Sequence, residues 1–271
     1  MKIGDLAVNR IGFGAMRVID NGNIWGEPKD RPKALKVLRR AIELGVNFFD
    51  TAESYGPQTS ETLIAEALHP YPKDLVIGTK CGVARPSASR WDPDGRPEKL
   101  KKDLEGSLKR LRLERIDLYQ LHTVDPKVPL EDSVGTLADM QREGKIRHVG
   151  LSNVDVRQLE RARKLVSVVS VQNRYSVVDR ECDDVVRACE KLGIAFLPWY
   201  PLGDGSALAL PKVKKLAKKL NAGPAQVAIA WLLARSPVIL PIPGTSQIKH
   251  LEENMAASKL KLEKADLAAL D

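Results

Sequence analysis

The stretch Gly45-Val-Asn-Phe-Phe-Asp50-Thr-Ala-Glu-Ser-Tyr55-Gly56 sets a pattern that the rest of the chain repeats. Its apolar run, residues 46–49, predicts a short buried strand that stops at Asp50, and the small and polar residues after it predict a loop. An acid and a phenol therefore follow the carboxyl end of a strand, where α/β folds hold their chemistry. On these residues alone a structural role fits equally well: Asp50 would cap the next helix and Tyr55 would cap the loop.

The same alternation of an apolar run and a helical segment continues along the whole chain. Strands are predicted at residues 11–16, 46–50, 75–80, 116–122, 146–151, 168–172, 194–199 and 238–242. Helices are predicted at residues 31–44, 60–68, 98–112, 130–143, 156–165, 183–191, 211–220, 224–235 and 248–257. Eight such units without a linker predict a closed α/β fold, a (β/α)8 TIM barrel that forms a single domain over residues 1–271, with a short N-terminal hairpin in residues 1–9. A doubly wound open sheet is the second interpretation.

Composition narrows the class of protein. The chain has 271 residues, of which 43% are hydrophobic and 29% charged, as in a globular enzyme with a sizeable core. No apolar run approaches the roughly 18 residues of a membrane span, and the N-terminus lacks the apolar segment of a signal peptide. The net charge is +8 (43 Lys and Arg minus 35 Asp and Glu), but acids interleave the basic residues and no nucleic-acid-binding motif occurs. We expect a cytoplasmic protein that binds neither nucleic acid nor membrane, and a phosphate-bearing small molecule as the partner of the positive charge.

If the barrel closes, the residues that end its strands converge on one mouth. Asp50, Tyr55, Lys80 and His122 then meet from the second, third and fourth strands. Lys80 would stabilise the phenolate of Tyr55, and Asp50 would hold Lys80 protonated. With His122 donating a hydrogen bond to the same oxygen, the group suits protonation of a carbonyl. No side chain donates hydride, so a reduction would require a nicotinamide cofactor.

The sequence offers little for metal binding. The three cysteines, Cys81, Cys182 and Cys189, have no metal-ligand spacing and predict reduced thiols. A metal-dependent barrel isomerase needs clustered carboxylates and histidines at strand ends, and only Asp50 and His122 qualify. We expect no metal site.

At this point the chain resembles the aldo-keto reductase superfamily over essentially its whole length. The resemblance rests on residues 45–56, Thr79-Lys80, Leu121-His122, Gly144-Lys-Ile-Arg-His-Val-Gly-Leu-Ser-Asn153, Val171-Gln172-Asn173, Pro201-Leu202-Gly203, Ile242-Pro-Gly-Thr-Ser246 and Leu251-Glu-Glu-Asn254. It implies a (β/α)8 barrel that reduces carbonyl groups with NADPH and uses a Tyr, Lys, Asp and His tetrad. Carried over by position, Tyr55 would be the general acid, Lys80 and Asp50 its tuning pair, and His122 the residue that orients the substrate.

The resemblance and the other strand ends also imply a cofactor site. In it, Trp199 would stack on the nicotinamide, although core packing is the alternative for Trp199 and a solvated helix face is the alternative for Glu253 and Asn254. The complete set is Gly14, Met16, Ser152, Asn153, Gln172, Trp199, Tyr200, Leu202, Pro243, Gly244, Thr245, Ser246, His250, Glu253 and Asn254.

One departure from the family concerns the adenosine 2′-phosphate. Many members place Lys and Arg around it, where this chain has Gly244 and His250 with Lys249 alongside. The hydroxyls of Thr245 and Ser246, backbone N–H groups, Lys249 and His250 would make the contacts instead. We expect NADPH/NADP+ to be preferred over NADH.

The substrate is expected to be a small-molecule carbonyl compound. Trp25 (in residues 17–30) and Trp91 (in residues 81–97) would line an open mouth, together with residues 200–209, unless they are packing anchors. The chain ends at Asp271 soon after a short helix, so we expect no long C-terminal loop over the substrate. Some segments resemble a bacterial subgroup that includes pyridoxal reductases, which makes pyridoxal a specific hypothesis.

A different class of function remains open at this stage. A nicotinamide-binding sensor or regulatory subunit with slow turnover would keep Trp199 and residues 242–254 but would not need the tetrad. The complete tetrad favours an enzyme. We expect a monomer or a weak homo-oligomer.

Overall fold

The computed structural model describes residues 1–19 and 21–270. Asp20, in the predicted loop at residues 17–30, and Asp271, on which the expectation about the chain end depends, lie outside the described residues. Within the described part of the chain, no helix is both long enough and apolar enough to span a membrane.

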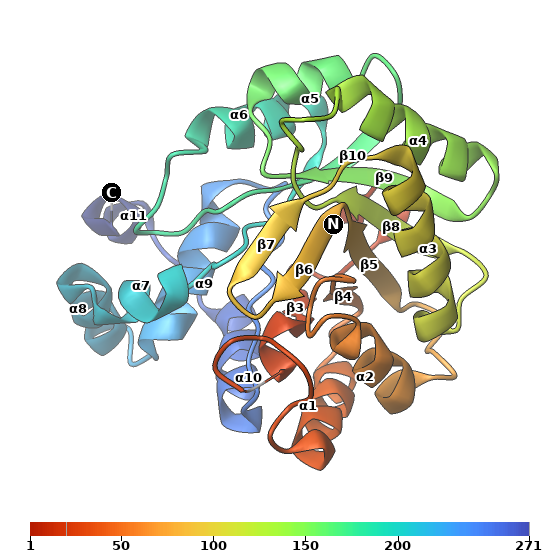
Figure 1. The fold of residues 1–271 in the computed structure, drawn as a ribbon. Helices are drawn as coiled ribbons and strands as arrows, with labels where there is room; N and C mark the ends of the chain where they lie inside the picture. Colours follow the sequence, from red (N-terminus) through yellow and green to blue (C-terminus); the bar gives the residue numbers. More distant parts are fainter. Residues whose placement is uncertain (20, 271) are drawn as a thin grey trace.

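Seven parallel strands form one curled sheet in the order β11-β10-β9-β8-β5-β4-β3 (Figure 1). Helices cover its outer face, so strands such as β4 and β5 are buried on both faces, which explains their continuous apolar runs. The strands are β3 (Phe13–Gly14), β4 (Phe48–Asp50), β5 (Val76–Cys81), β8 (Ile116–Leu121), β9 (Ile146–Ser152), β10 (Val168–Gln172) and β11 (Ala195–Phe196).

The helices begin and end where local chemistry favours it. Asp30 caps α1 by accepting a hydrogen bond from the backbone N–H of Lys33 at 2.9 Å. Gly45 and Gly193 follow α1 and α6 with φ of 84° and 66°, a left-handed conformation that glycine adopts without strain. The helices are α1 (Arg31–Glu43), α2 (Thr59–Leu68), α3 (Pro97–Leu111), α4 (Leu130–Arg142), α5 (Val156–Ala162), α6 (Asp183–Leu192), α7 (Ser206–Ala209), α8 (Pro211–Lys219), α9 (Pro224–Arg235), α10 (Ile248–Ala256) and α11 (Lys264–Leu270).

Residues 238–242, predicted as the eighth strand, close the barrel but form no regular strand. Two backbone hydrogen bonds of 2.9 Å join this closing segment to Phe196 of β11, and a third of 2.9 Å runs from the Gly12 N–H to the Pro241 carbonyl. Because Pro241 and Pro243 have no N–H to donate, a full ladder beside β3 cannot form. The prediction of a regular strand here is wrong, whereas the barrel is confirmed and the open sheet is not.

The first core strand is shorter than the predicted residues 11–16. It consists of Phe13–Gly14 (β3) and turns directly into the 3-10 helix η1 (Ala15–Val18). Gly14 in this stretch allows another part of the protein's own backbone to approach closely. A Cβ atom on Gly14 would lie 2.6 Å from the Ile242 carbonyl oxygen of the closing segment.

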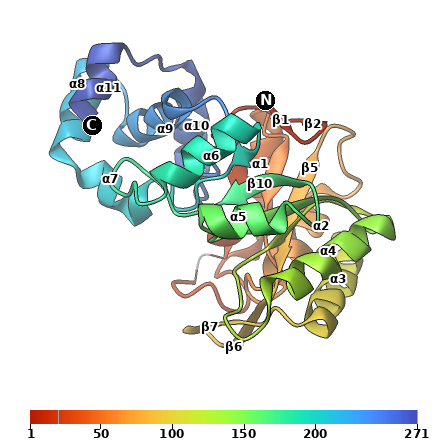
Figure 2. The same ribbon diagram turned by 90° about the horizontal axis from the view of Figure 1, so that it is seen from above.

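Two hairpins lie at opposite ends of the barrel (Figure 2). The N-terminal one, β1 (Lys2–Ile3) paired with β2 (Leu6–Ala7), confirms the predicted hairpin. Its residues Ile3 and Leu6 share a buried cluster with Phe48 and Leu118 of the barrel strands, so it plugs the end away from the carboxyl ends of the strands.

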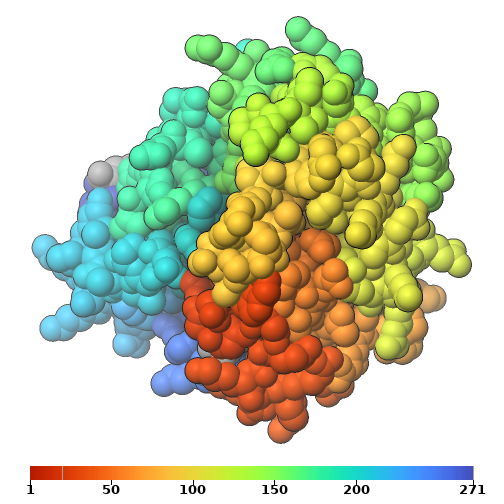
Figure 3. All heavy atoms as spheres, viewed as in Figure 1, coloured from red at the N-terminus to blue at the C-terminus, as the bar shows by residue number. Residues whose placement is uncertain are grey.

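The other hairpin was not predicted. Residues 81–97 were expected to be a loop, but β6 (Val83–Ser87) and β7 (Arg90–Pro93) pair antiparallel within it. Pro86 and Ser87 weaken the strand signal of β6, and only an isolated hairpin edge tolerates that proline. The hairpin lies across the centre of the face seen in Figure 3. The expected loop at residues 200–209 likewise contains the short 3-10 helix η2 (Gly203–Gly205) and α7.

Replacing Gly14 with Ala tests the tight closure of the barrel. The backbone of Gly14 suits alanine, with φ of −85°, so the cost is steric and comes from the carbonyl 2.6 Å from the new Cβ. Overpacking of this kind costs about 1–3 kcal/mol, which lowers Tm by roughly 2–4 °C per kcal/mol in a chain of this size. The matched control is Gly135→Ala in α4, where nothing lies within 4 Å of the added Cβ and a small stabilisation is expected. Equal Tm values for the two variants would contradict the tight closure.

Candidate active site

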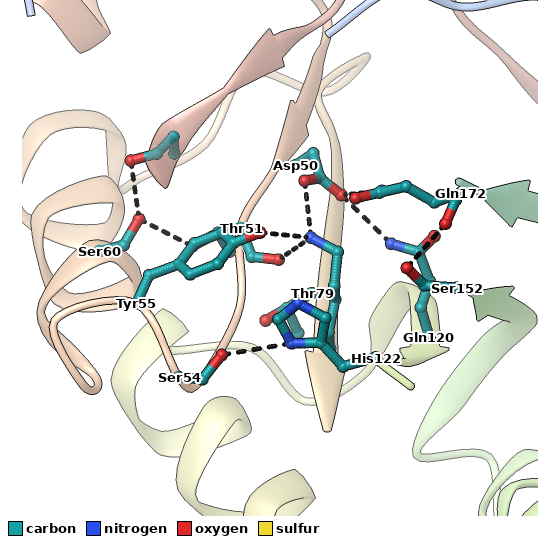
Figure 4. Close-up of polar contacts among 12 residues, drawn as sticks. Asp50, Thr51, Ser54, Tyr55, Ser60, Thr79, Gln120, His122, Ser152 and Gln172 are labelled. Atoms are coloured by element: carbon teal, nitrogen blue, oxygen red, sulfur yellow. Dashed lines mark hydrogen bonds and ion pairs between the residues drawn. The ribbon is translucent and has the colours of Figure 1, made fainter. Parts of the chain in front are cut away.

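Strand register brings the predicted catalytic residues to one end of the barrel. Asp50, the last residue of β4, pairs with Gly78 of β5, and Lys80 two residues further pairs with Gln120 of β8. Since strands are parallel, their carboxyl ends meet at the same mouth, and His122 follows β8 there. Figure 4 shows Asp50, Tyr55 and His122 grouped at this mouth, with the Asp50 carboxylate facing Gln172 and His122 facing Ser54.

A buried ion pair lies at the centre of the site. The Lys80 ammonium donates to Asp50 Oδ2 at 2.6 Å and to the Thr51 carbonyl at 2.8 Å, and both charged side chains are at most 3% exposed. The second carboxylate oxygen, Oδ1, accepts from the amides of Gln172 at 2.8 Å and Gln120 at 3.2 Å. A buried pair is stable only when its remaining lone pairs and protons are satisfied. The two glutamines and Thr51 provide that satisfaction here.

Tyr55 lies next to this pair. Its hydroxyl is 3.3 Å from the Lys80 ammonium, and the residue is 7% exposed. Burial raises the pKa of the Tyr55 phenol and the positive charge of Lys80 only partly opposes the rise, so the phenol is protonated at neutral pH. Burial by itself would lower the pKa of Lys80, but Asp50 and Tyr55 together outweigh it, so the pKa is raised and the ammonium stays charged.

His122 lies against Tyr55 with the two rings edge to face, 5.8 Å between centroids. Its Nδ1 contacts the Ser54 hydroxyl at 3.2 Å. Burial, followed by the positive charges of Lys80 and Arg85, holds the pKa of His122 well below its usual range. The imidazole is therefore neutral at physiological pH and can donate a hydrogen bond only from its protonated ring nitrogen.

A cavity of about 750 Å³ opens above these residues. Asp50, Tyr55 and His122 line it, whereas Lys80 lies behind them. The predicted substrate and cofactor residues that also line the cavity are Trp91, Gly14, Met16, Ser152, Asn153, Gln172, Trp199, Tyr200, Leu202, Pro243, Gly244, Thr245, Ser246 and His250.

The polar groups of this cavity are already ordered by hydrogen bonds to one another. Asn153 donates to the His122 carbonyl at 3.0 Å and accepts from the Trp199 indole at 3.0 Å, so one amide links the histidine to the aromatic ring. The Ser152 hydroxyl donates to the Gln172 carbonyl at 2.7 Å. These groups thus lie in place for a planar ligand before it binds.

Three predicted residues are not in the cavity lining. Trp25 lies behind the wall, with its ring 5.3 Å from the Arg85 guanidinium carbon. In α10, Asn254 is buried and the Glu253 carboxylate lies against Gly223, outside the lining. Their roles in binding stay predictions.

Several residues of the site were not predicted from the sequence. Gln120 could have been found, because it lies two residues before His122 on the same strand and alternation places both on one face. Arg17 and Asp204, which form an ion pair and also line the cavity, come from segments without a regular pattern. Arg85 is buried beside the site, and an arginine in a segment expected to be a loop gives no signal of burial.

Comparison with known proteins agrees with this geometry. Residues 10–271 match the model of the aldo/keto reductase family. The chain is 49% identical over 273 residues to an uncharacterized oxidoreductase of Schizosaccharomyces pombe, covering 100% of this chain and 88% of the relative. It is 43% identical over 275 residues to pyridoxine 4-dehydrogenase of Escherichia coli, covering 99% of this chain and 96% of the relative.

A solved structure agrees in fold. The glycerol dehydrogenase of Gluconobacter oxydans superposes with a TM-score of 0.91 at 25% identity, over 100% of this chain and 93% of that one. The chain therefore belongs to the aldo/keto reductase family, whose members are oxidoreductases that use NADP(H).

Proposed function

We propose that this protein reduces an aldehyde or ketone to an alcohol, with NADPH as cofactor and Tyr55 as the proton donor. The observation that carries the proposal is the continuous contact from Asp50 through Lys80 to the Tyr55 hydroxyl, at 2.6 and 3.3 Å. A protonated phenol beside a buried ammonium suits transfer of a proton to a carbonyl oxygen. We further propose that residues 1–271 form a single domain around this site.

Each tetrad residue has a separate task in this proposal. Tyr55 gives its proton to the carbonyl oxygen, and Lys80 stabilises the phenolate that remains. Asp50 keeps Lys80 charged and fixes its position, since a buried ammonium without a counter-charge would lose its proton. Neutral His122 donates a hydrogen bond that orients the substrate oxygen toward Tyr55.

The residues of the cavity fit a nicotinamide cofactor, which when bound supplies the hydride. Ser152, Asn153 and Gln172 present the hydroxyl and amide groups that a carboxamide requires, and the Trp199 ring offers a face for stacking. Thr245 also lines the cavity and lies just before the start of α10. Its neighbours Ser246 and His250 also line the cavity, and these residues would contact the 2′-phosphate of NADPH.

Tyr55→Phe separates an enzyme from a nicotinamide-binding sensor. Removal of the phenol oxygen eliminates the proton donor and leaves the ring, so kcat should fall by at least about 10²-fold. NADPH affinity, measured by fluorescence titration, should stay within about twofold of wild type, because Tyr55 belongs to the catalytic side of the cavity. A variant with wild-type turnover would refute the proposed role of Tyr55, and unchanged cellular output of an inactive variant would favour the sensor.

Cofactor preference is tested by steady-state kinetics with one aldehyde and either NADPH or NADH. We expect a higher kcat/KM for NADPH, because only NADPH carries the phosphate that the hydroxyls of Thr245 and Ser246 and the imidazole of His250 would bind. His250→Ala should reduce the ratio of kcat/KM with NADPH to kcat/KM with NADH. Equal or better use of NADH by the wild-type protein would contradict the expectation.

Pyridoxal is the specific substrate hypothesis, supported by the similarity to the pyridoxine 4-dehydrogenase of Escherichia coli. Its flat ring would fit between the aromatic residues of the mouth, including Trp91. We expect turnover of pyridoxal when NADPH absorbance is followed in a panel of aldehydes and ketones. Good turnover of simple aromatic aldehydes with none of pyridoxal would eliminate this substrate.

A further inference from the structure

One buried cation beside the site has no task in the mechanism above. Arg85 of β6 is 8% exposed, and no carboxylate pairs with its guanidinium within residues 1–19 and 21–270. Its Nε atom is buried and lacks a hydrogen-bond partner in the same part of the chain. Burial also lowers the pKa of Arg85. A buried cation without an anion is costly, so its retention points to a positional task.

The Arg85 guanidinium connects three segments that are distant in sequence. It donates to the Ser54 carbonyl at 3.0 Å, to the Ala88 carbonyl at 2.8 Å and to the Ile24 carbonyl at 3.5 Å. Its carbon lies 3.5 Å from the centroid of the Trp91 ring, which stacks on the guanidinium plane. The loop before α1, the loop after β4 and the β6–β7 hairpin therefore meet at one side chain.

Three of these contacts, with Trp91, Ser54 and Ile24, lead to a group that faces the cavity. Trp91 lines the cavity, and its ring lies 6.2 Å from Tyr55 and 6.3 Å from His122, centroid to centroid. Ser54 holds Nδ1 of His122 through its hydroxyl. Ile24 also lines the cavity and has a φ of 55°, an unfavourable conformation for a β-branched residue that needs external support.

We propose that Arg85 is a positioning residue that holds the Trp91 ring across the mouth of the cavity and holds the Ser54 backbone beside His122. With Trp91 fixed in this way, the site selects aromatic carbonyl substrates. The hydroxyl of a fixed Ser54 donates to Nδ1 of His122, which leaves the proton on Nε2 for the substrate oxygen. A fixed Trp91 offers a flat face to an aromatic ring. This proposal rests on the proposed carbonyl reduction.

Four variants separate these roles from general stability. Arg85→Met keeps an apolar side chain and removes the guanidinium group. Arg85→Lys keeps the positive charge but loses the planar guanidinium and its several N–H donors. Trp91→Ala removes the ring that Arg85 holds, and Ser54→Ala removes the hydroxyl that contacts His122 while keeping the backbone carbonyl that Arg85 binds. Arg90→Met is the matched control, because Arg90 lies on the same hairpin, is 64% exposed at its side chain and pairs with Asp92.

The kinetics are measured with 4-nitrobenzaldehyde and with propanal, in NADPH. Trp91→Ala should raise KM about tenfold for the aromatic aldehyde only, and Ser54→Ala should lower kcat about fivefold for both substrates. Arg85→Met should combine the two effects, and Arg85→Lys should behave in the same way. Arg85→Met with Trp91→Ala should be non-additive in KM. NADPH affinity should match that of Arg90→Met, and Tm should fall below it only modestly, because three hydrogen bonds to carbonyls are lost.

Several results would overturn the proposal. Wild-type kinetics in Arg85→Met would do so, as would full rescue by Arg85→Lys, because charge alone would then suffice. Unfolding or loss of NADPH binding in both Arg85 variants would assign Arg85 to stability instead. A wild-type protein that reduces no aldehyde refutes the proposed function and this proposal together, whereas an active wild type with unaffected Arg85 variants refutes this proposal alone.

Discussion

The buried ion pair between Lys80 and Asp50 is the interaction on which the site depends. Two charges with almost no exposure are tolerable only because, besides each other, four groups satisfy them: the Thr51 carbonyl, the Tyr55 hydroxyl and the amides of Gln120 and Gln172. The pair and these groups come from four strands or the loops directly after them. The pair therefore has all these partners only when these strands have assembled in register, and the same assembly positions Tyr55, the proposed proton donor.

Closure itself depends on residues that cannot make ordinary strands. The closing segment contains prolines that interrupt its hydrogen bonding, and Gly14 lets that segment approach β3 closely enough to complete the barrel. A regular eighth strand would pair more strongly, whereas residues 243–246, directly after the interrupted one, line the cavity. This interrupted ladder thus lies beside the part of the mouth that we assign to the cofactor.

The sequence was informative where side-chain position follows from strand register and uninformative where it follows from loop shape. Asp50, Lys80 and His122 end or follow buried strands, so their convergence could be predicted from the order of strands alone. Trp25 and Trp91 both lie in segments without periodicity, and only one lines the cavity. What separates them is the β6–β7 hairpin and the left-handed backbone at Ile24, and both contact Arg85 in a way that no local pattern encodes. The catalytic roles themselves stay predictions.

The distribution of charge around His122 connects these observations. Lys80 is neutralised by Asp50, whereas Arg85 contacts carbonyls and rings and no carboxylate among the described residues, so two cations and one anion lie around His122. The positive charges of Lys80 and Arg85 oppose protonation of His122, and in the proposed reduction they would favour negative charge developing on a substrate oxygen. The Lys80 charge that opposes protonation of His122 also opposes, in part, the rise that burial causes in the pKa of Tyr55.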